Sequence, residues 1–307
     1  MSVFYPEGVL FETPENKQYL KTLEKLEEAK AANITLEARA SICDSSHNLI
    51  VDLECMKGII PKNDGAIGIA SGQTRDIALI SKVGKPVCFK VKSFGTDMRG
   101  NMVAILSRKA AQEEFLREYV SCLECGDIIE AKVTHLEHFG AFVDIGCGIP
   151  SLIPIDAISV SRISHPADRF SVGDTIRAVV KLVDENQRVY LSHKELLGTW
   201  EENAAQFCVG ETVDGIIRSV EDYGIFVELT PNLAGLAEPK ENARIGNHAS
   251  VYIKAIIPDK MKIKLVIVDI FDSEPQRPEI EYYISESHIN RWQYSTDNSD
   301  KTVCTDF

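Results

Sequence analysis

An aromatic residue followed by glycine, any residue and phenylalanine occurs twice in this 307-residue chain, at a spacing of 84 residues. The first copy contains Phe139 and Phe142, and the second contains Tyr223 and Phe226. Aromatic rings on the surface of a small β barrel can stack on nucleic-acid bases, and each stacked base contributes about 1–3 kcal/mol. The two copies therefore predict two base-stacking surfaces.

Strand alternation leaves the orientation of the second ring in each copy open. Phe142 and Phe226 each stand next to a valine, so one member of each neighbouring pair faces the core and the other faces outward. If either phenylalanine faced inward, it would be a core residue only. Phe139 and Tyr223 precede a glycine at the entry to a strand, where an exposed ring is expected.

The sequence around the first copy has the alternation of short β-strands. Five runs are separated by turn residues, and they cover 128–134, 140–145, 151–154, 175–182 and 188–192. Five such strands, with a long connection at 155–173, predict a closed barrel of the OB type.

Similar patterns extend this prediction to most of the chain. We expect a mainly β protein with three tandem five-stranded OB-fold barrels, joined by short helices and preceded by an N-terminal helix. The expected boundaries are 1–33 for the N-terminal segment, 34–119 for a degenerate barrel, 122–197 and 208–272 for the two barrels with aromatic pairs, and 273–307 for a C-terminal tail. In the degenerate barrel, His47 and Ile50 stand roughly where the aromatic pair stands later.

The segments outside the barrels have weaker signals. Helical periodicity from Glu15 to Ala32 predicts one amphipathic helix with Thr13 as its N-cap. This helix either packs on the first barrel or docks a protein partner. The tail is expected to follow a turn-rich linker at 273–278 and to add a strand and a turn to the last barrel.

The charge of the chain restricts how it could bind nucleic acid. The net charge is −13, whereas non-specific nucleic-acid binding usually needs a basic surface that releases counterions. Residues 120–200 and 208–275 each carry 7 basic and 11 acidic side chains. Stacking would then have to supply much of the affinity, and we expect binding of modest strength that weakens with salt.

Metal and enzyme chemistry have little support in the sequence. Cys122 and Cys125 precede His135 and His138, but only two residues separate the histidines, fewer than zinc-finger spacing requires. We therefore expect reduced thiols and no bound metal. His165, His193 and His248 each stand alone and are expected at the surface. The phosphate-cradling, HExxH and GxSxG motifs are missing, which predicts a protein without catalytic residues or cofactors.

The composition predicts a folded, soluble protein. Hydrophobic residues make up 44% of the chain, but no apolar run approaches the length of a membrane span. The first residues lack a basic start and an apolar signal core. A cytoplasmic location without membrane partners is therefore expected.

The segment 122–197 resembles the S1-type RNA-binding domain, which occurs in bacterial ribosomal protein S1 and in ribonucleases such as polynucleotide phosphorylase. The matching residues are Gly126, Phe139, Gly140, Phe142, Gly146, Leu152, Pro154, Gly173, Asp174, Asp184, Arg188, Leu191, Ser192 and Lys194. The resemblance is good over 122–197, fair over 208–271 and poor over 34–113.

In that family the RNA-binding face carries two aromatic residues, a histidine, an aspartate and an arginine. The resemblance implies the RNA-binding residues Phe139, Phe142, Asp184 and Arg188 in the middle barrel, and Tyr223, Phe226, Asp259 and Lys262 in the last one. Arginine and lysine can both pair with a phosphate. Each aspartate either belongs to the RNA contact, orients its basic neighbour or caps the hairpin turn.

The family histidine is replaced in both barrels, by Pro154 and by Glu238. A carboxylate beside a phosphate path is repulsive, so we expect the middle barrel to bind RNA more tightly than the last one.

The resemblance implies a function in translation without catalysis. The expected partners are single-stranded RNA, in particular mRNA, and the small ribosomal subunit. A protein–protein adaptor and an accessory subunit of an RNA-processing complex are the alternatives. A protein partner would bind through residues 1–119.

Overall fold

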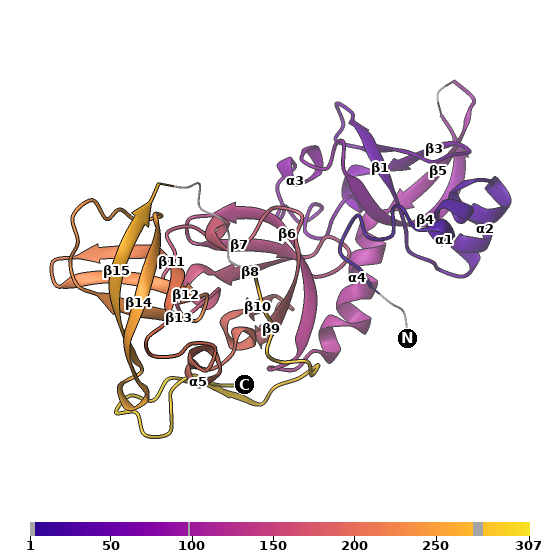
Figure 1. The fold of residues 1–307 in the computed structure, drawn as a ribbon. Helices are drawn as coiled ribbons and strands as arrows, with labels where there is room; N and C mark the ends of the chain where they lie inside the picture. Colours follow the sequence, from indigo (N-terminus) through magenta and orange to yellow (C-terminus); the bar gives the residue numbers. More distant parts are fainter. Residues whose placement is uncertain (1–3, 98, 273–278) are drawn as a thin grey trace. The chain divides into compact units, whose positions relative to one another are not determined.

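The computed structural model describes residues 4–97, 99–272 and 279–307 and contains three closed five-stranded β barrels (Figure 1). This result confirms the predicted mainly β architecture. The chain forms two compact units. The first consists of residues 4–123 with the turn at 144–150, and the second contains 124–143 with the rest of the described chain.

The strands close in the same spatial pattern in each barrel. The first barrel contains β1 (Leu36–Cys43), β2 (Leu49–Asp52), β3 (Lys57–Ile60), β4 (Pro86–Thr96) and β5 (Met102–Ser107). The second contains β6 (Ile128–Glu137), β7 (Gly140–Asp144), β8 (Pro150–Pro154), β9 (Thr175–Val183) and β10 (Val189–Ser192). The third contains β11 (Thr212–Glu221), β12 (Gly224–Thr230), β13 (Leu233–Ala237), β14 (His248–Ile257) and β15 (Lys262–Phe271). In every barrel the third and fifth strands pair in parallel.

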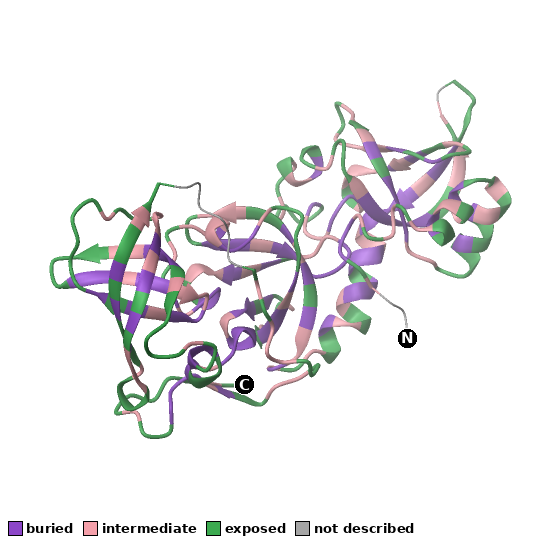
Figure 2. Cartoon of the chain, in the orientation of Figure 1, coloured by how far each residue is buried: buried purple, intermediate pink, exposed green. Residues whose placement is uncertain are grey.

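Alternating burial separates a core face from a solvent face along these strands. In β15, Ile263, Leu265 and Ile267 are buried, and the residues between them are exposed (Figure 2). Inward-facing aliphatic side chains of this kind fill the barrels, and burying one stabilises the fold by roughly 1.5–3 kcal/mol. The outward positions are therefore free for contacts outside the barrel.

The N-terminal segment contains two helices, so the prediction of one continuous helix was wrong. α1 (Pro14–Leu20) begins at the predicted N-cap Thr13, whose hydroxyl accepts from the Asn16 N–H. A second cap, Thr22, accepts from the Lys25 N–H and starts α2 (Leu23–Ala31). Thr22 has extended backbone angles that a helix cannot continue through. Buried leucines of both helices belong to the core of the first barrel, so the helices pack on this barrel as one alternative expected.

Short helices connect the other elements. They are α3 (Ile77–Ile80), α4 (Arg108–Glu118), α5 (Trp200–Ala204) and the 3-10 turns η1 (Lys62–Asp64), η2 (Val120–Cys122), η3 (Ile155–Ala157), η4 (Pro166–Asp168), η5 (Lys194–Leu197) and η6 (Pro258–Lys260). Trp200 is buried in the core of the third barrel. Its ring therefore has a packing role and does not offer a stacking surface.

A buried ion cluster fastens the second barrel to the third within the second unit. The Nη2 atom of Arg169 donates to Glu228 at 2.6 Å, and Nε of Arg218 donates to the same carboxylate at 2.8 Å. The side chains of Arg169 and Glu228 are 0% and 2% exposed. Removing one partner of such a pair typically costs about 3–5 kcal/mol, because the other charge stays buried and unpaired. The cluster thus ties the long connection of the second barrel to strands of the third.

The tail contacts two barrels, whereas the sequence predicted packing on the last one only. Ser287 accepts from the Ile128 N–H at 2.8 Å, and His288 bonds to Asp127 at 2.8 Å, so the tail first crosses the second barrel. The strands β16 (Arg291–Gln293) and β17 (Cys304–Asp306) then form a hairpin. Trp292 joins the core of the third barrel. The predicted linker at 273–278 lies outside the described residues.

His193 of the second barrel is buried and contacts the tail. This residue was predicted at the surface, but it is fully buried and its Nε2 atom lies 3.2 Å from the Tyr282 hydroxyl of the tail. Burial lowers the pKa of His193 to about 4. The imidazole is therefore neutral at pH 7 and serves as a packed hydrogen-bonding group.

A buried acidic cluster fastens the N-terminal segment of the first unit. Glu37 accepts from the N–H groups of Gly8 and Phe11, both at 2.9 Å. Burial raises the pKa of Glu37 to about 7, and burial together with the charge of Glu7 raises the pKa of Asp144 to about 6. Burial also opposes ionisation of Glu7 itself, but Arg108 and Lys82 outweigh it and lower the pKa of Glu7 to about 2.

We predict that the free energy of unfolding falls as pH rises from about 5 to about 8, by at most about 1.4 kcal/mol per pH unit for each carboxyl group concerned. The lowered pKa of His193 acts in the opposite direction below about pH 6.5, but the two raised carboxyl pKa values outweigh it. The raised pKa values of Glu37 and Asp144 mean that their stabilising contribution is complete below about pH 4 and is lost as pH rises through 6 and 7. Glu37→Gln should make this dependence shallower, because Asp144 then remains as the raised carboxyl group and His193 opposes it below about pH 6.5. Urea denaturation across this range measures it, with exposed Glu54→Gln as the control. Equal slopes for all three proteins would contradict the assignment.

Candidate nucleic-acid interface

One row of outward-facing side chains crosses the second, third and fifth strands of the third barrel. Phe226 on β12 lies opposite Leu236 on β13, and Leu236 pairs in parallel with Lys264 on β15. The strand neighbours of Phe226 are buried in the core, and Phe226 itself is only partly buried. The alternative that this phenylalanine faces inward is therefore wrong.

Tyr223 stands at the turn before this row and is 69% exposed. Its ring centre lies 6.2 Å from that of Phe226, with an angle of 87° between the ring planes. Edge-to-face geometry at this distance is favourable for aromatic pairs and leaves ring faces open. The two predicted aromatic residues therefore form one surface.

A groove of about 600 Å³ runs beside this aromatic pair. It is lined by Tyr223, Phe226, Ala234, Leu236, Ala237, Glu238, Lys254, Met261, Lys262, Ile263, Lys264 and Leu265. The predicted residue Lys262 thus lies close to the aromatic pair, together with the carboxylate of Glu238. Two further lysines, Lys254 and Lys264, were not anticipated from the sequence.

The second barrel presents the corresponding surface. Phe139 is 56% exposed, and its ring centre lies 5.8 Å from that of Phe142 at an angle of 89°. Phe142 is partly buried between buried neighbours on β7, so this ring also faces outward. The ring of His135 lies 6.3 Å from the ring of Phe142 in a nearly parallel orientation. This barrel therefore has a larger set of rings than the sequence predicted.

Tyr190 adds another ring that the sequence analysis missed. Tyr190 on β10 pairs in parallel with Leu152 on β8, and β8 is next to β7, the strand that carries Phe142. The Tyr190 side chain is 41% exposed. Leu152 and Tyr190 correspond by repeat position to Leu236 and Lys264 of the third barrel. Arg188, a predicted residue, is exposed two positions before Tyr190.

The first barrel has an aliphatic row in the same place. Ile50 pairs with Ile59, and Ile59 pairs in parallel with Ile105. His47, at the position of the missing first aromatic residue, lies 3.6 Å from the carboxylate of Asp76. This row therefore lacks the ring faces that the other two barrels present.

The glycine inside each aromatic motif allows two strands to approach closely. A Cβ atom on Gly140 would lie 2.4 Å from the carbonyl oxygen of Ile153, and one on Gly224 would lie 2.7 Å from that of Ala237. Real Cβ atoms essentially never come this close to another heavy atom. Glycine therefore keeps the third strand against the second, which holds the row together.

A lysine occupies the same irregular position on the fourth strand of every barrel. The register of strand pairing skips one residue there, which leaves Lys92, Lys181 and Lys254 out of the ladder. Lys92 is 3.1 Å from Asp64. Lys181 and Lys254 are exposed, and the described residues form no ion pair with either side chain. The recurring lysine is visible in the sequence, but its position beside the row depends on the bulge.

Asp184 caps a hairpin turn, as one of the sequence alternatives expected. Its Oδ1 atom accepts from the N–H groups of Asn186 and Arg188 at 2.8 and 2.9 Å. The intervening Gln187 has a positive φ of 59°. Three other turns use the same arrangement, with Asp44, Asp97 and Asp144 as the acceptors. A contact between Asp184 and RNA stays a prediction.

Asp259 does not repeat this turn. It is exposed within η6, and no hydrogen bond of its side chain is found among the described residues. It also does not line the groove that contains Lys262. Its predicted role in RNA binding stays a prediction as well.

We predict that Asp184→Ala lowers the free energy of unfolding by about 1 kcal/mol, because two backbone N–H groups lose their acceptor. Asp259→Ala is the matched control and should leave stability within about 0.5 kcal/mol of the parent protein. Thermal and urea denaturation measure both effects. Equal stabilities of the two variants would show that the turn does not depend on the carboxylate.

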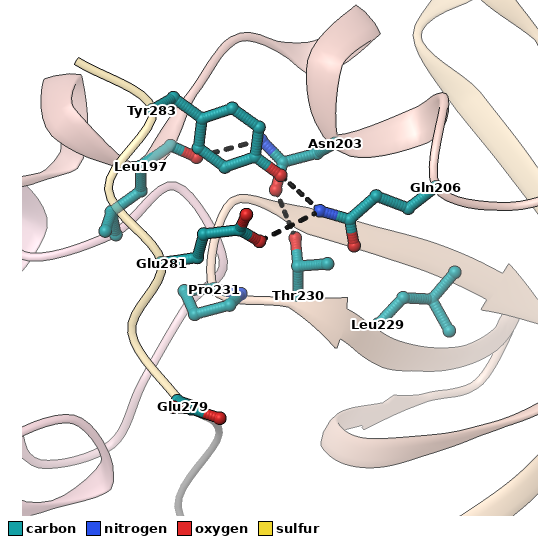
Figure 3. A pocket seen from close by; sticks show the side chains of 9 residues that line it. All are labelled: Leu197, Asn203, Gln206, Leu229, Thr230, Pro231, Glu279, Glu281 and Tyr283. Atoms are coloured by element: carbon teal, nitrogen blue, oxygen red, sulfur yellow. Dashed lines mark hydrogen bonds between the residues drawn. The ribbon is translucent and has the colours of Figure 1, made fainter. Parts of the chain in front are cut away.

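A second cavity lies under the tail and differs in character (Figure 3). Its volume is about 240 Å³, and it is lined by Leu197, Asn203, Gln206, Leu229, Thr230, Pro231, Glu279, Glu281 and Tyr283. Thr230 donates to Asn203 at 2.6 Å, and Gln206 bonds to Glu281 and Tyr283. The polar groups bond to one another, and the described residues that line the cavity include no basic side chain. This lining of two glutamates and neutral side chains does not suit a phosphate backbone.

The described residues contain no group of three or more His, Cys, Asp or Glu side chains that could hold a metal ion. The described helices include none that is long and apolar enough to cross a membrane.

A family model described as the S1 RNA binding domain matches residues 123–194. The chain is 33% identical over 238 residues to small ribosomal subunit protein bS1 of Leuconostoc lactis, covering 74% of this chain and 51% of the relative. It is 31% identical over 257 residues to the protein of the same name from Staphylococcus saprophyticus, covering 81% and 62%. The chain thus spans between half and two thirds of these relatives.

A solved structure was also found, a multidomain protein with nucleic acid binding domains from Streptococcus pneumoniae. It is 16% identical, with a TM-score of 0.25, and the match covers 77% of this chain and 73% of the other.

Proposed function

We propose that this chain is a tandem S1-domain protein and that it binds single-stranded RNA through the outward rows of its second and third barrels. The observation that carries the proposal is the outward-facing aromatic pair, present twice in the same edge-to-face geometry. Three lysines line the groove beside the pair of the third barrel, and the second barrel has the exposed cations Lys181 and Arg188 at corresponding positions. Solvent-exposed rings of this size are not needed for the core. Base stacking is the contact they suit, because every base has an aromatic face.

The basic side chains supply the positive charge that phosphate contacts require. Arg188 and Lys181 on the second barrel, and the three groove lysines on the third, can contact successive phosphates while bases stack on the rings. RNA binding by a chain with a net charge of −13 then depends on local cations. Such contacts release few counterions, so the affinity should fall moderately with salt.

The biological partner that we propose is mRNA at the small ribosomal subunit. The relatives over most of this chain are named as proteins of that subunit. A protein in this role acts in the cytoplasm by binding and positioning RNA, without a catalytic step of its own.

The first barrel favours a protein contact as a second function. Its row consists of partly buried isoleucines, and the lysine at its bulge is paired with Asp64. A surface with little free charge and no open ring suits a protein better than RNA. Residues 4–119 are therefore the segment that we assign to a protein partner, at the ribosome or in an RNA-processing complex.

We predict that Phe139→Ala combined with Phe142→Ala weakens binding of single-stranded RNA at least about tenfold, because two stacking surfaces are lost. Fluorescence anisotropy of a labelled RNA of about 12 nucleotides measures the affinity, with a DNA duplex beside it. Ile50→Ala is the matched control, since Ile50 occupies the same row position in the first barrel. Unchanged affinity of the correctly folded double variant would exclude this face and favour the adaptor function.

We also predict that Tyr223→Ala combined with Phe226→Ala has a smaller effect than the double variant of the second barrel. Glu238 lines the groove of the third barrel and repels phosphate, whereas the second barrel has Pro154 there and adds the ring of Tyr190. The same anisotropy titration compares the two variants. A larger loss for the third-barrel variant would reverse this ranking.

A further inference from the structure

One position on the fifth strand differs between two otherwise similar rows. It holds Tyr190 in the second barrel and Lys264 in the third, and each pairs in parallel with a leucine of the third strand. The other row positions carry the same kinds of residue, since Phe142 corresponds to Phe226 and Leu152 to Leu236. The difference is therefore concentrated at a single site.

We propose that this position determines how each barrel holds RNA: Tyr190 stacks a further base, and Lys264 contacts a further phosphate. The inference rests on the proposed RNA binding and deepens it. It assigns the second barrel a binding mode dominated by stacking, and the third barrel a mode more dependent on charge.

The surroundings of Tyr190 suit a stacking role. The side chain is 41% exposed, and its hydroxyl has no hydrogen bond to the described residues. It is two strands away from Phe142, and the strand between them carries its partner, the partly buried Leu152. A base that leaves the Phe139–Phe142 pair can therefore be followed by another on Tyr190.

The surroundings of Lys264 suit a phosphate contact. Lys254, Lys262 and Lys264 line one groove, and among the described residues none of the three forms an ion pair. Glu238 is the one carboxylate among the residues that line this groove. The corresponding positions of the second barrel supply two cations, Lys181 and Arg188.

The two modes differ in their response to salt. Each phosphate neutralised on a single strand adds about 0.7 to the slope of log affinity against log salt concentration. Stacking has no such counterion release and persists at high salt. A substitution between tyrosine and lysine at this position should therefore change both the salt dependence of the affinity and the affinity at high salt. Lysine should steepen the salt dependence, and tyrosine should make it shallower.

The test exchanges the two residue types. Each exchange is made in a full-length chain in which alanine replaces the aromatic pair of the other barrel. Tyr190→Lys is made with Tyr223→Ala and Phe226→Ala, and Lys264→Tyr is made with Phe139→Ala and Phe142→Ala. Anisotropy with single-stranded RNA at about 50 and 200 mM salt gives both slopes. We expect Tyr190→Lys to steepen the slope by about 0.7 and to lose about tenfold in affinity at the higher salt, and Lys264→Tyr to make the slope shallower by about 0.7.

Two control substitutions separate the effect of this row position from the general effects of adding a positive charge or removing a ring. Tyr252→Lys makes the same change of charge at a tyrosine that is 40% exposed on β14 but does not line the groove, and it should change neither quantity appreciably. Tyr190→Leu removes the ring without adding charge, and it should lower affinity at both salt concentrations with an unchanged slope.

The outcomes distinguish this inference from the proposed function. If the parent chain binds RNA but the exchanges leave the slopes unchanged, or Tyr252→Lys acts like Tyr190→Lys, the division between the barrels is wrong and RNA binding stands. If the parent chain binds no RNA at either salt concentration, the proposed function fails and the inference fails with it.

Discussion

Parallel pairing of the third and fifth strands is the constraint on which the candidate interface depends. It closes each barrel, and it brings a residue of the last strand beside one that lies far earlier in the chain, as with Leu152 and Tyr190. Antiparallel pairing of the second and third strands, as between Phe226 and Leu236, extends the row by one more residue. Because side chains alternate along a strand, the members of the row face outward when their neighbours fill the core. The barrel thus determines where the row lies, and the three side chains on its second, third and fifth strands determine what the row can bind.

The three barrels carry different side chains at the positions of the row. Isoleucines occupy the row of the first barrel. A tyrosine pairs with the leucine of the second barrel, whose neighbouring strand carries a phenylalanine, and a phenylalanine and a lysine flank the leucine of the third. Several other charges are used inside the protein. Arg169 and Glu228 fasten two barrels together, and Arg108 holds Glu7 within the first unit. The cations left at the surface beside the rings therefore matter more for binding than the net charge does.

Local patterns made much of this architecture predictable. The five strands of the second barrel follow the expected runs closely, and the structure settles the open orientation of Phe142 and Phe226, which both face outward. Long-range pairing was harder to foresee. Tyr190 and Lys264 join the row only through a parallel contact with a distant strand, and the bulge lysines need the exact register to be located. The tail and His193 were misjudged for the same reason, since a polar sequence gave no sign of the surface that buries them.

Chemical-shift mapping tests the central claim most directly. Isotope-labelled full-length protein would be titrated with a single-stranded RNA of about 12 nucleotides, and the perturbed amides would be assigned. We expect the largest perturbations around Phe139, Phe142 and Tyr190, followed by the groove of the third barrel. The row of Ile50, Ile59 and Ile105 should change little. Perturbations concentrated on the first barrel, or away from every row, would contradict the assignment of the RNA-binding face.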